Sequence, residues 1–187
     1  AHQQLIDKAS SESIRRQSER SGIADANAQS TSNPAARVQQ LAALRGLKPG
    51  TTYVYAVGDG SPDGWTAPAE FTTAPAGAAP FSFIYMGDAQ NGLDRWGVLL
   101  HNAYRARPDA AFYLMAGDLV NRGAERWDWD SFFENAKGVF DRRPIVPVLG
   151  NHEYQSADPI LHLAQFALLR NGPKTIPPEP AYAFESS

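Results

Sequence analysis

The sequence of 187 residues contains no cysteine, so disulfide bonds are excluded and cysteine usage says nothing about the redox compartment. It also has no excess of positive charge: the formal net charge at pH 7 is −3, and no basic run occurs. Proteins that bind nucleic acid usually carry a basic patch or stripe. We therefore expect no nucleic-acid partner.

Long apolar stretches are missing as well. No segment is long and apolar enough to cross a bilayer as a helix, so we expect no membrane partner. A polar segment follows Ala1 and no signal peptide is visible, which fits a mature or trimmed start. Neither the glycine-rich dinucleotide fingerprint nor a P-loop follows an expected strand, which argues against a nucleotide-binding doubly wound domain.

One kind of turn, by contrast, occurs three times between residues 81 and 153. In each case a short apolar run, rich in aromatic or β-branched residues, stops at a glycine that precedes Asp or Asn. The repeats are residues 81–86 before Gly87-Asp88, residues 111–116 before Gly117-Asp118, and residues 144–149 before Gly150-Asn151-His152-Glu153. Such runs predict buried strands. Apolar stripes with helical spacing lie between them, and the interval of about thirty residues is typical of βα units.

Strands joined by helical crossovers form a parallel sheet, and their carboxyl ends meet at one edge. Asp88, Asp118 and Asn151 would therefore converge there, and the glycine before each would let the backbone turn sharply and approach an ion. Carboxylates, a carboxamide and the imidazole of His152 suit a divalent or trivalent metal that prefers oxygen and nitrogen. Taken singly, each residue also has a simpler explanation, because an Asp at such a position often caps a helix.

These turns resemble the first three motifs of the calcineurin-like metallophosphoesterases, with the Gly-Asn-His-Glu tetrapeptide at 150–153 the most specific of them. Residues 47–55, 57–60 and 71–75 look like the fibronectin-type-III-like N-terminal domain of the purple acid phosphatase branch. The resemblance implies an α/β fold: the N-terminal half of a metallophosphoesterase α/β sandwich at 81–187. A small all-β fibronectin III-like domain at 1–75, itself incomplete, and a linker at 76–80 would precede it.

The implied activity is acid phosphatase-like hydrolysis of phosphate esters by a water that two metal ions activate. The substrates would be phosphorylated small molecules or proteins, and the location secreted or periplasmic. The resemblance makes Asp118 the ligand that bridges two ions (Fe, Zn, Mn or Mg), with Asp88 on one ion and Asn151 on the other. His152 becomes the catalytic residue, which stabilises transition-state charge or protonates the leaving group.

Two further residues are candidates for substrate binding. Arg122 stands where a related branch carries a phosphate-contacting arginine, although an ion pair with the acidic helix that follows is an equal alternative. Gln90 occupies a position where the wider superfamily often carries histidine, so it would bind metal weakly or hydrogen-bond to water. Asn121 replaces the tyrosine ligand of the purple branch, which predicts a protein without the purple colour.

The family takes three more histidine ligands from later motifs, but His162 is the only histidine after His152. His162 lies in an amphipathic helical pattern at 160–169, so we do not expect it to bind metal. We expect instead that the chain is part of a longer polypeptide, whose remaining half of the catalytic domain completes the site.

An alternative function is a non-catalytic fragment whose β domain binds a partner or a carbohydrate. The first 40 residues are polar and rich in Ser, Ala, Gln and Asn, with a candidate strand fragment at residues 5–7. Gly58-Asp59 also follows an expected strand, but it opens a loop rich in glycine and proline. We therefore do not expect Asp59 to touch metal.

Overall fold

A computed structural model describes residues 44–58, 61–155, 158–173 and 181–184. The chain divides into two compact units, Ala1–Ala76 and Gly77–Ser187, and each is described here by itself. The division falls within the segment that the sequence predicts as a linker. The strand fragment predicted at residues 5–7 and the residue Asp59 lie outside the described ranges.

The described part of the first unit is a two-stranded antiparallel hairpin of β1 (Thr52–Tyr55) and β2 (Ala69–Thr72). Tyr53 is the register partner of Phe71, and their rings stack with centroids 5.8 Å apart. Aromatic pairs across strands stabilise such ladders, which accounts for the β pattern of this stretch. Beyond β1 the hairpin continues only as a single bridge between Gly58 and Trp65.

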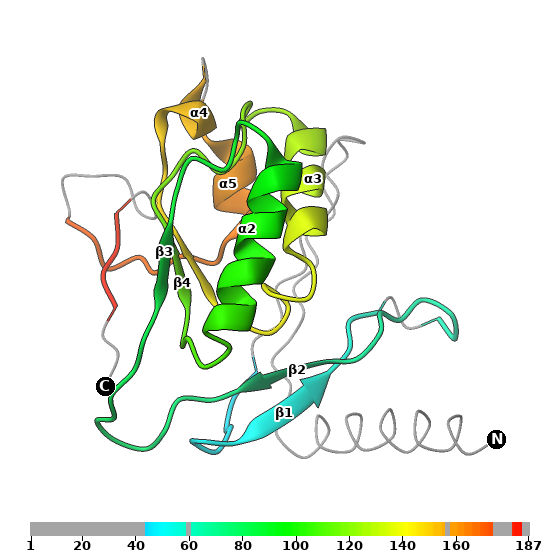
Figure 1. The fold of residues 1–187 in the computed structure, drawn as a ribbon, viewed down its shortest axis with the longest axis vertical. Coiled ribbons are helices and arrows are strands. Elements are labelled where there is room, and N and C mark those ends of the chain that lie inside the picture. Colours follow the sequence, from blue (N-terminus) through cyan, green and yellow to red (C-terminus); the bar gives the residue numbers. More distant parts are fainter. Residues whose placement is uncertain (1–43, 59–60, 156–157, 174–180, 185–187) are drawn as a thin grey trace. The chain divides into compact units, whose positions relative to one another are not determined.

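The second unit is built on a parallel sheet with the strand order β3-β4-β5 (Figure 1). Its elements are β3 (Ile84–Met86), α2 (Leu93–Ala106), β4 (Tyr113–Met115), α3 (Arg126–Ala136), β5 (Ile145–Pro147), α4 (Asn151–Tyr154) and α5 (Ile160–Gln165). Helices α2 and α3 are the crossovers between successive strands. The predicted α/β fold class is confirmed: a unit with a parallel sheet and helical crossovers comes after a small β unit in the sequence.

The core lies where α2 and α3 pack on one face of the sheet. Trp96 of α2 stacks on Phe132 of α3 with ring centroids 4.8 Å apart, and Trp129 is fully buried beside them. Tyr113 and Met115 of β4 close the core from the sheet side. The helical stripes predicted from the sequence therefore form the buried face, as their 3.6-residue period requires.

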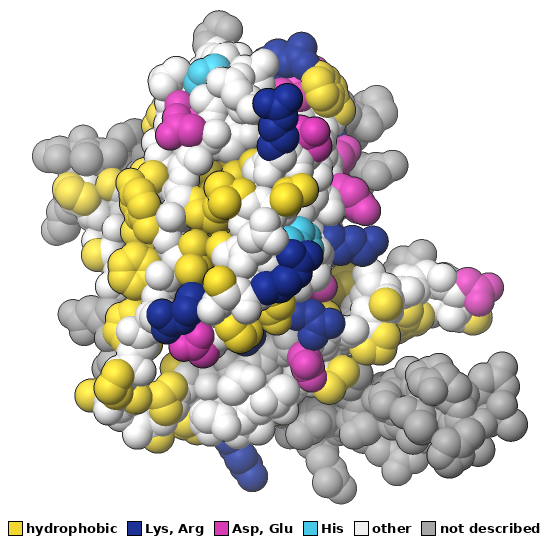
Figure 2. Space-filling model, viewed as in Figure 1, with side chains coloured by type: hydrophobic (Ala, Val, Ile, Leu, Met, Phe, Trp, Pro, Cys, Tyr) yellow, Lys and Arg dark blue, Asp and Glu magenta, His cyan; other side chains and the backbone are white. Residues whose placement is uncertain are grey.

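The other face of the sheet differs from the prediction of fully buried strands. Tyr85 of β3 is 66% exposed, and outside the strands Phe83 stacks on Phe112 with centroids 5.2 Å apart. Figure 2 shows hydrophobic side chains gathered over β3 and β4. Successive strand residues point to opposite faces, and within the described residues α2 and α3 cover only one of them. Each strand is also only three residues long, shorter than its apolar run.

His162 of α5 lies in this aromatic core. Its side chain is fully buried, and its ring lies 4.9 Å from that of Phe166 and 5.9 Å from that of Trp129. Neither ring nitrogen has a hydrogen-bond partner among the described residues. Burial disfavours the charged imidazolium and lowers the pKa of His162 from 6.5 to about 4. The expectation that His162 is not a metal ligand agrees with these apolar surroundings.

We predict that His162 makes the fold sensitive to acid. Burial lowers the pKa of His162 in the folded state. Between about pH 6.5 and 4 the unfolded chain therefore binds a proton that the native chain does not bind. Stability is therefore lost as the pH falls from about 6.5 towards 4, by up to about 3 kcal/mol for the whole shift. His162→Leu introduces an apolar side chain of similar volume that cannot take up a proton. This substitution should remove the part of the pH dependence of the unfolding free energy that His162 causes. Urea unfolding of both proteins at several pH values measures it.

His101→Gln provides the control for this prediction, because His101 lies only half-buried on α2. Equal losses of unfolding free energy between pH 6.5 and 4 in the wild type and His162→Leu would contradict the prediction.

Candidate metal centre

The three predicted turns meet at the carboxyl edge of the β3-β4-β5 sheet (Figure 1). The N–H of Asp88 donates to the carbonyl of Gly117 at 3.2 Å, and the N–H of Gln90 donates to the carbonyl of Asp118 at 3.1 Å. Asn151 begins α4 directly after β5 and its connecting turn. Parallel pairing and these bonds thus bring residues 88, 118 and 151 to one edge.

Both aspartates adopt the left-handed backbone conformation, with φ of 52° at Asp88 and 51° at Asp118. These are the only non-glycine residues with positive φ among those that the structure describes. The sequence predicts a sharp turn at the glycine before each ligand, but of these three glycines only Gly117 has a positive φ; at Gly87 and Gly150 the backbone is not left-handed. Aspartate tolerates the left-handed region better than most residues, and strain of this kind concentrates at functional sites.

Glycine is needed here so that the turns can approach one another. A Cβ on Gly117 would lie 2.7 Å from the backbone nitrogen of Gly150, and a Cβ on Gly150 would clash with the carboxylate of Asp118. Oδ1 of Asp118 in turn accepts the N–H of His152 at 2.9 Å. The second and third turns are therefore in direct contact.

Glu153 holds these two turns together, a role that the sequence analysis missed. The side chain is 2% exposed, and Oε2 accepts the N–H groups of Asp118 at 2.9 Å and Gly150 at 2.7 Å. Oε1 accepts those of Leu119 at 2.8 Å and, more weakly, Val120 at 3.4 Å. The available signal was its place at the third helical position after Gly150, where a glutamate commonly reaches back to the start of its helix.

We predict a large loss of stability for Glu153→Gln. A carboxylate only accepts hydrogen bonds, whereas the amide NH₂ of glutamine would face N–H groups that also donate. Each buried N–H left without a partner costs about 1–3 kcal/mol. The unfolding free energy in urea should fall by at least that amount. Glu134→Gln, on the exposed side of α3, is the matched control and should change little. Equal stability of the two variants would contradict the role assigned to Glu153.

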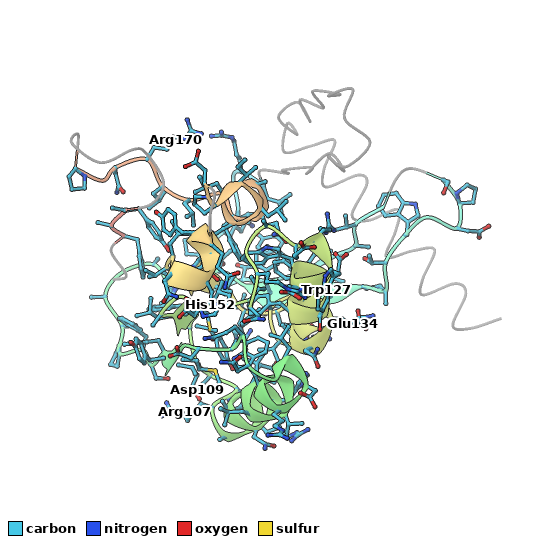
Figure 3. All side chains as sticks on the ribbon, turned by 90° about the horizontal axis from the view of Figure 1, so that it is seen from above. Arg107, Asp109, Trp127, Glu134, His152 and Arg170 are labelled. Carbon is cyan, nitrogen blue, oxygen red and sulfur yellow. The ribbon has the colours of Figure 1, made fainter. Side chains whose placement is uncertain are left out.

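Figure 3 shows His152 on α4. One nitrogen of its ring has defined partners. Its Nδ1 lies 2.8 Å from the carbonyl oxygen of Asn121, and the side-chain amide of Gln155 lies 3.0 Å from the same nitrogen. A carbonyl can only accept, so the Asn121 contact requires the proton on Nδ1, whereas the amide nitrogen of Gln155 can only donate and would require the proton on Nε2. We assign the proton to Nδ1, because the Asn121 contact is the shorter of the two. In the neutral ring Nε2 is then the unprotonated nitrogen, and it is available to a ligand or a proton.

Arg122 contacts the helix that follows it, as the alternative interpretation expects. Its guanidinium lies 4.4 Å from the ring centroid of Trp127, and its Nε lies 3.5 Å from the buried carboxylate of Asp128. The backbone N–H of Arg122 donates to the same carboxylate at 2.9 Å. The side chain is still 45% exposed, so contact with a substrate stays a prediction.

The residues at the edge fit part of a metal site. Asp88 and Asn151 are exposed and Asp118 is half-buried, so their oxygens are accessible. The set of two carboxylates and one carboxamide suits hard or borderline metal ions. No group of three or more His, Asp or Glu side chains placed to hold a metal occurs within the described ranges. Three ligand side chains do not fill the coordination shells of two ions, so further ligands are needed.

Comparisons with known proteins show the family of the chain. Residues 81–182 match the family model for the calcineurin-like phosphoesterases, and residues 6–73 match that for the purple acid phosphatase N-terminal domain. A solved structure of a purple acid phosphatase from yellow lupin (Lupinus luteus) seeds aligns with a TM-score of 0.51 and 21% identity. The alignment covers 59% of this chain and 22% of the lupin chain. No curated protein matches the sequence.

The lupin structure is too distant in sequence to show more than the fold. The chain spans about a fifth of its length. Within the described residues no helix has the length and apolar character needed to span a membrane. The first family model, however, covers more than half of the chain and includes all three turns. The chain therefore belongs to the calcineurin-like phosphoesterase family.

Proposed function

We propose that the protein hydrolyses phosphate esters with two metal ions held at the carboxyl edge of its parallel sheet. The observation that carries this proposal is the contact between the three turns, in which Asp88 and Asp118 share an unusual backbone conformation and Asn151 starts the adjoining helix. The phosphate esters of small molecules or of proteins are the substrate class. A secreted or periplasmic location belongs to the same proposal.

The residues of the chain have separate roles in this proposal. Asp118 would be shared by the two ions, and Asp88 and Asn151 would each hold one; the ions would supply charge stabilisation and an activated water. Glu153 fixes the backbone of the turns that present these ligands. His152, oriented through Nδ1, would present Nε2 to the leaving oxygen, and as the imidazolium it would give the Nε2 proton to that oxygen. Further ligands would come from the remaining half of the catalytic domain.

A longer form of the protein that includes this remaining half provides the test. It should bind two metal ions per chain and release phosphate from an aryl phosphate, and chelation should abolish both. Two ions without hydrolysis would favour the non-catalytic alternative. Hydrolysis that survives complete removal of metal would reject the metal-dependent mechanism.

We predict that the iron-loaded protein lacks a strong visible band. Asn121 has no phenolate, and its carbonyl is engaged by His152, so this position supplies no tyrosinate-to-iron charge transfer. An absorption spectrum of a concentrated iron-loaded sample measures this. A strong band would contradict the prediction and would identify another tyrosine as an iron ligand. Tyr154, which is 44% exposed beside the third turn, is the first to replace by phenylalanine.

A further inference from the structure

A cavity of about 330 Å³ lies beside the candidate metal centre. Its walls come from the loops after β3 and β4, from the first turn of α2, and from α3 between Trp127 and Asn135. Residues that line it include Gln90, Asp94, Asn121, Trp127, Ser131 and Asn135. The volume is at the small end of the range of roughly 300–1,000 Å³ that is usual for ligand pockets.

Helices α2 and α3 pack closely at one of the lining residues, Asn135. A Cβ on Gly97 of α2 would lie 3.0 Å from the Cβ of Asn135 on α3, so the helices are nearly in backbone contact at this level. The same pair of helices contributes Asp94 and Trp127 to the wall of the cavity.

Two of the lining residues belong equally to the turns of the metal centre. The N–H of Gln90 donates to the carbonyl of Asp118, and the carbonyl of Asn121 holds Nδ1 of His152. Figure 3 looks down on this edge and shows Trp127 on α3 and His152 on α4. A phosphate ester held at Asp118 thus has this cavity next to it, in reach of its alcohol portion.

The wall of the cavity is polar and presents both acceptors and donors of hydrogen bonds. Oε1 of Gln90 is buried without a hydrogen-bond partner among the described residues. The amide nitrogen of Asn135 donates to the carbonyl of Ser131 at 2.9 Å, which leaves its oxygen as an acceptor, and Asp94 adds a carboxylate. The hydroxyl of Ser131 and the indole N–H of Trp127 can donate. A buried acceptor without a donor is costly, so a ligand whose groups both donate and accept is favoured.

We propose that this cavity binds the alcohol portion of the substrate and selects a polyhydroxylated alcohol, such as a sugar or a sugar alcohol. The proposal rests on the phosphoesterase function proposed above, because it assigns the leaving group of that reaction. Hydroxyl groups can donate to the unpaired Oε1 of Gln90 and to the carboxylate of Asp94. The ring of Trp127, against which Arg122 packs, adds apolar surface for the carbon skeleton.

Binding of the free alcohol tests the cavity without any catalysis. Sorbitol is the probe and 1-hexanol, with the same number of carbons and one hydroxyl, is the matched control. Sorbitol should shift the indole N–H of Trp127 and the side-chain amide of Gln90 in ¹H–¹⁵N spectra in a saturable way, and hexanol should not. Ser131→Leu, which fills the cavity, and Asp94→Asn should each weaken sorbitol binding, Ser131→Leu by about tenfold or more.

Asp130→Asn is the control variant, since Asp130 faces solvent on α3 and pairs with Arg126. Its affinity for sorbitol should equal that of the wild type. If sorbitol gives no saturable shift, or if Asp94→Asn and Ser131→Leu bind it as the wild type does, the proposal is overturned and the cavity holds only water. The milder Asp94→Asn keeps the test valid if Ser131→Leu does not fold.

Hydrolysis by the longer protein separates this proposal from the proposed function. The ratio of kcat/KM for sorbitol 6-phosphate to that for hexyl phosphate should exceed one and fall about tenfold in Ser131→Leu. Hydrolysis of neither ester would reject the phosphoesterase function, while the sorbitol titration would still decide whether the cavity binds polyols. Hydrolysis of both esters with a ratio that Ser131→Leu leaves unchanged would reject the cavity alone.

Discussion

Asp118→Asn is expected to remove both metal ions and to reduce turnover by about 10²–10³-fold or more, since the removal of one positioned electrostatic group alone costs about this much. Asparagine has the same shape, and its Oδ1 can still accept the N–H of His152, so the turn should keep its conformation. The substitution removes the negative charge, and without this charge one side chain is not expected to bind two cations. Elemental analysis of the longer protein and phosphate release from an aryl ester measure the two effects.

Asp109→Asn is the control, because Asp109 is exposed and pairs with Arg107 beyond the end of α2. It should leave metal content and turnover unchanged. Asp88→Asn is expected to be intermediate, with loss of one ion. Full metal content and activity in Asp118→Asn would contradict the bridging role. A loss of folded structure in that variant, seen by circular dichroism, would instead show that the charge of Asp118 stabilises the turn.

The arrangement of the three turns, which the structure confirms, depends on patterns of short range. Apolar runs that end in glycine, spaced by one helix, are enough to predict parallel strands with their carboxyl ends at one edge. The placement of Asp88, Asp118 and Asn151 follows from this topology, because each comes within a few residues of the end of its strand, while their role as metal ligands stays a prediction. The fold class was accessible for the same reason, and the family through the resemblance of the turns to known motifs.

The remaining features depend on contacts between segments distant in sequence. The carboxylate of Glu153 accepts hydrogen bonds from the N–H groups of Asp118 and Leu119, which lie more than 30 positions before it in the sequence. Nothing local in the sequence shows these contacts. The burial of His162 depends on Trp129, which belongs to another helix. The cavity beside the centre likewise requires the spacing between α2 and α3, which Gly97 and Asn135 determine.

The structure also refines what the sequence says about His152. The imidazole is held through Nδ1 by the carbonyl of Asn121, the residue that replaces the tyrosine of the purple branch. The change at position 121 therefore coincides with a backbone contact that fixes the ring of His152. With the proton on Nδ1, Nε2 is the atom that can act on a substrate oxygen.

His152→Ala in an active longer form is accordingly expected to retain both metal ions and to lose turnover by about 10²–10⁴-fold. The loss should be smaller for aryl phosphates, whose leaving groups need little protonation, than for alkyl phosphates. Measurement of kcat for both ester types, together with metal content, tests this. Loss of metal would make His152 a ligand and reject the assignment.

Two conservative variants separate proton transfer from charge stabilisation. His152→Asn can place its amide nitrogen near Nδ1 and keep the bond to Asn121, but it has no group at Nε2. His152→Gln can place an N–H donor near Nε2, but an amide cannot exchange a proton at neutral pH. If Nε2 transfers a proton, both variants should be as impaired as His152→Ala on alkyl phosphates. Recovery of turnover in His152→Gln but not in His152→Asn, equal for the two ester types, would show instead that position 152 donates a hydrogen bond to the charge that develops on the phosphate.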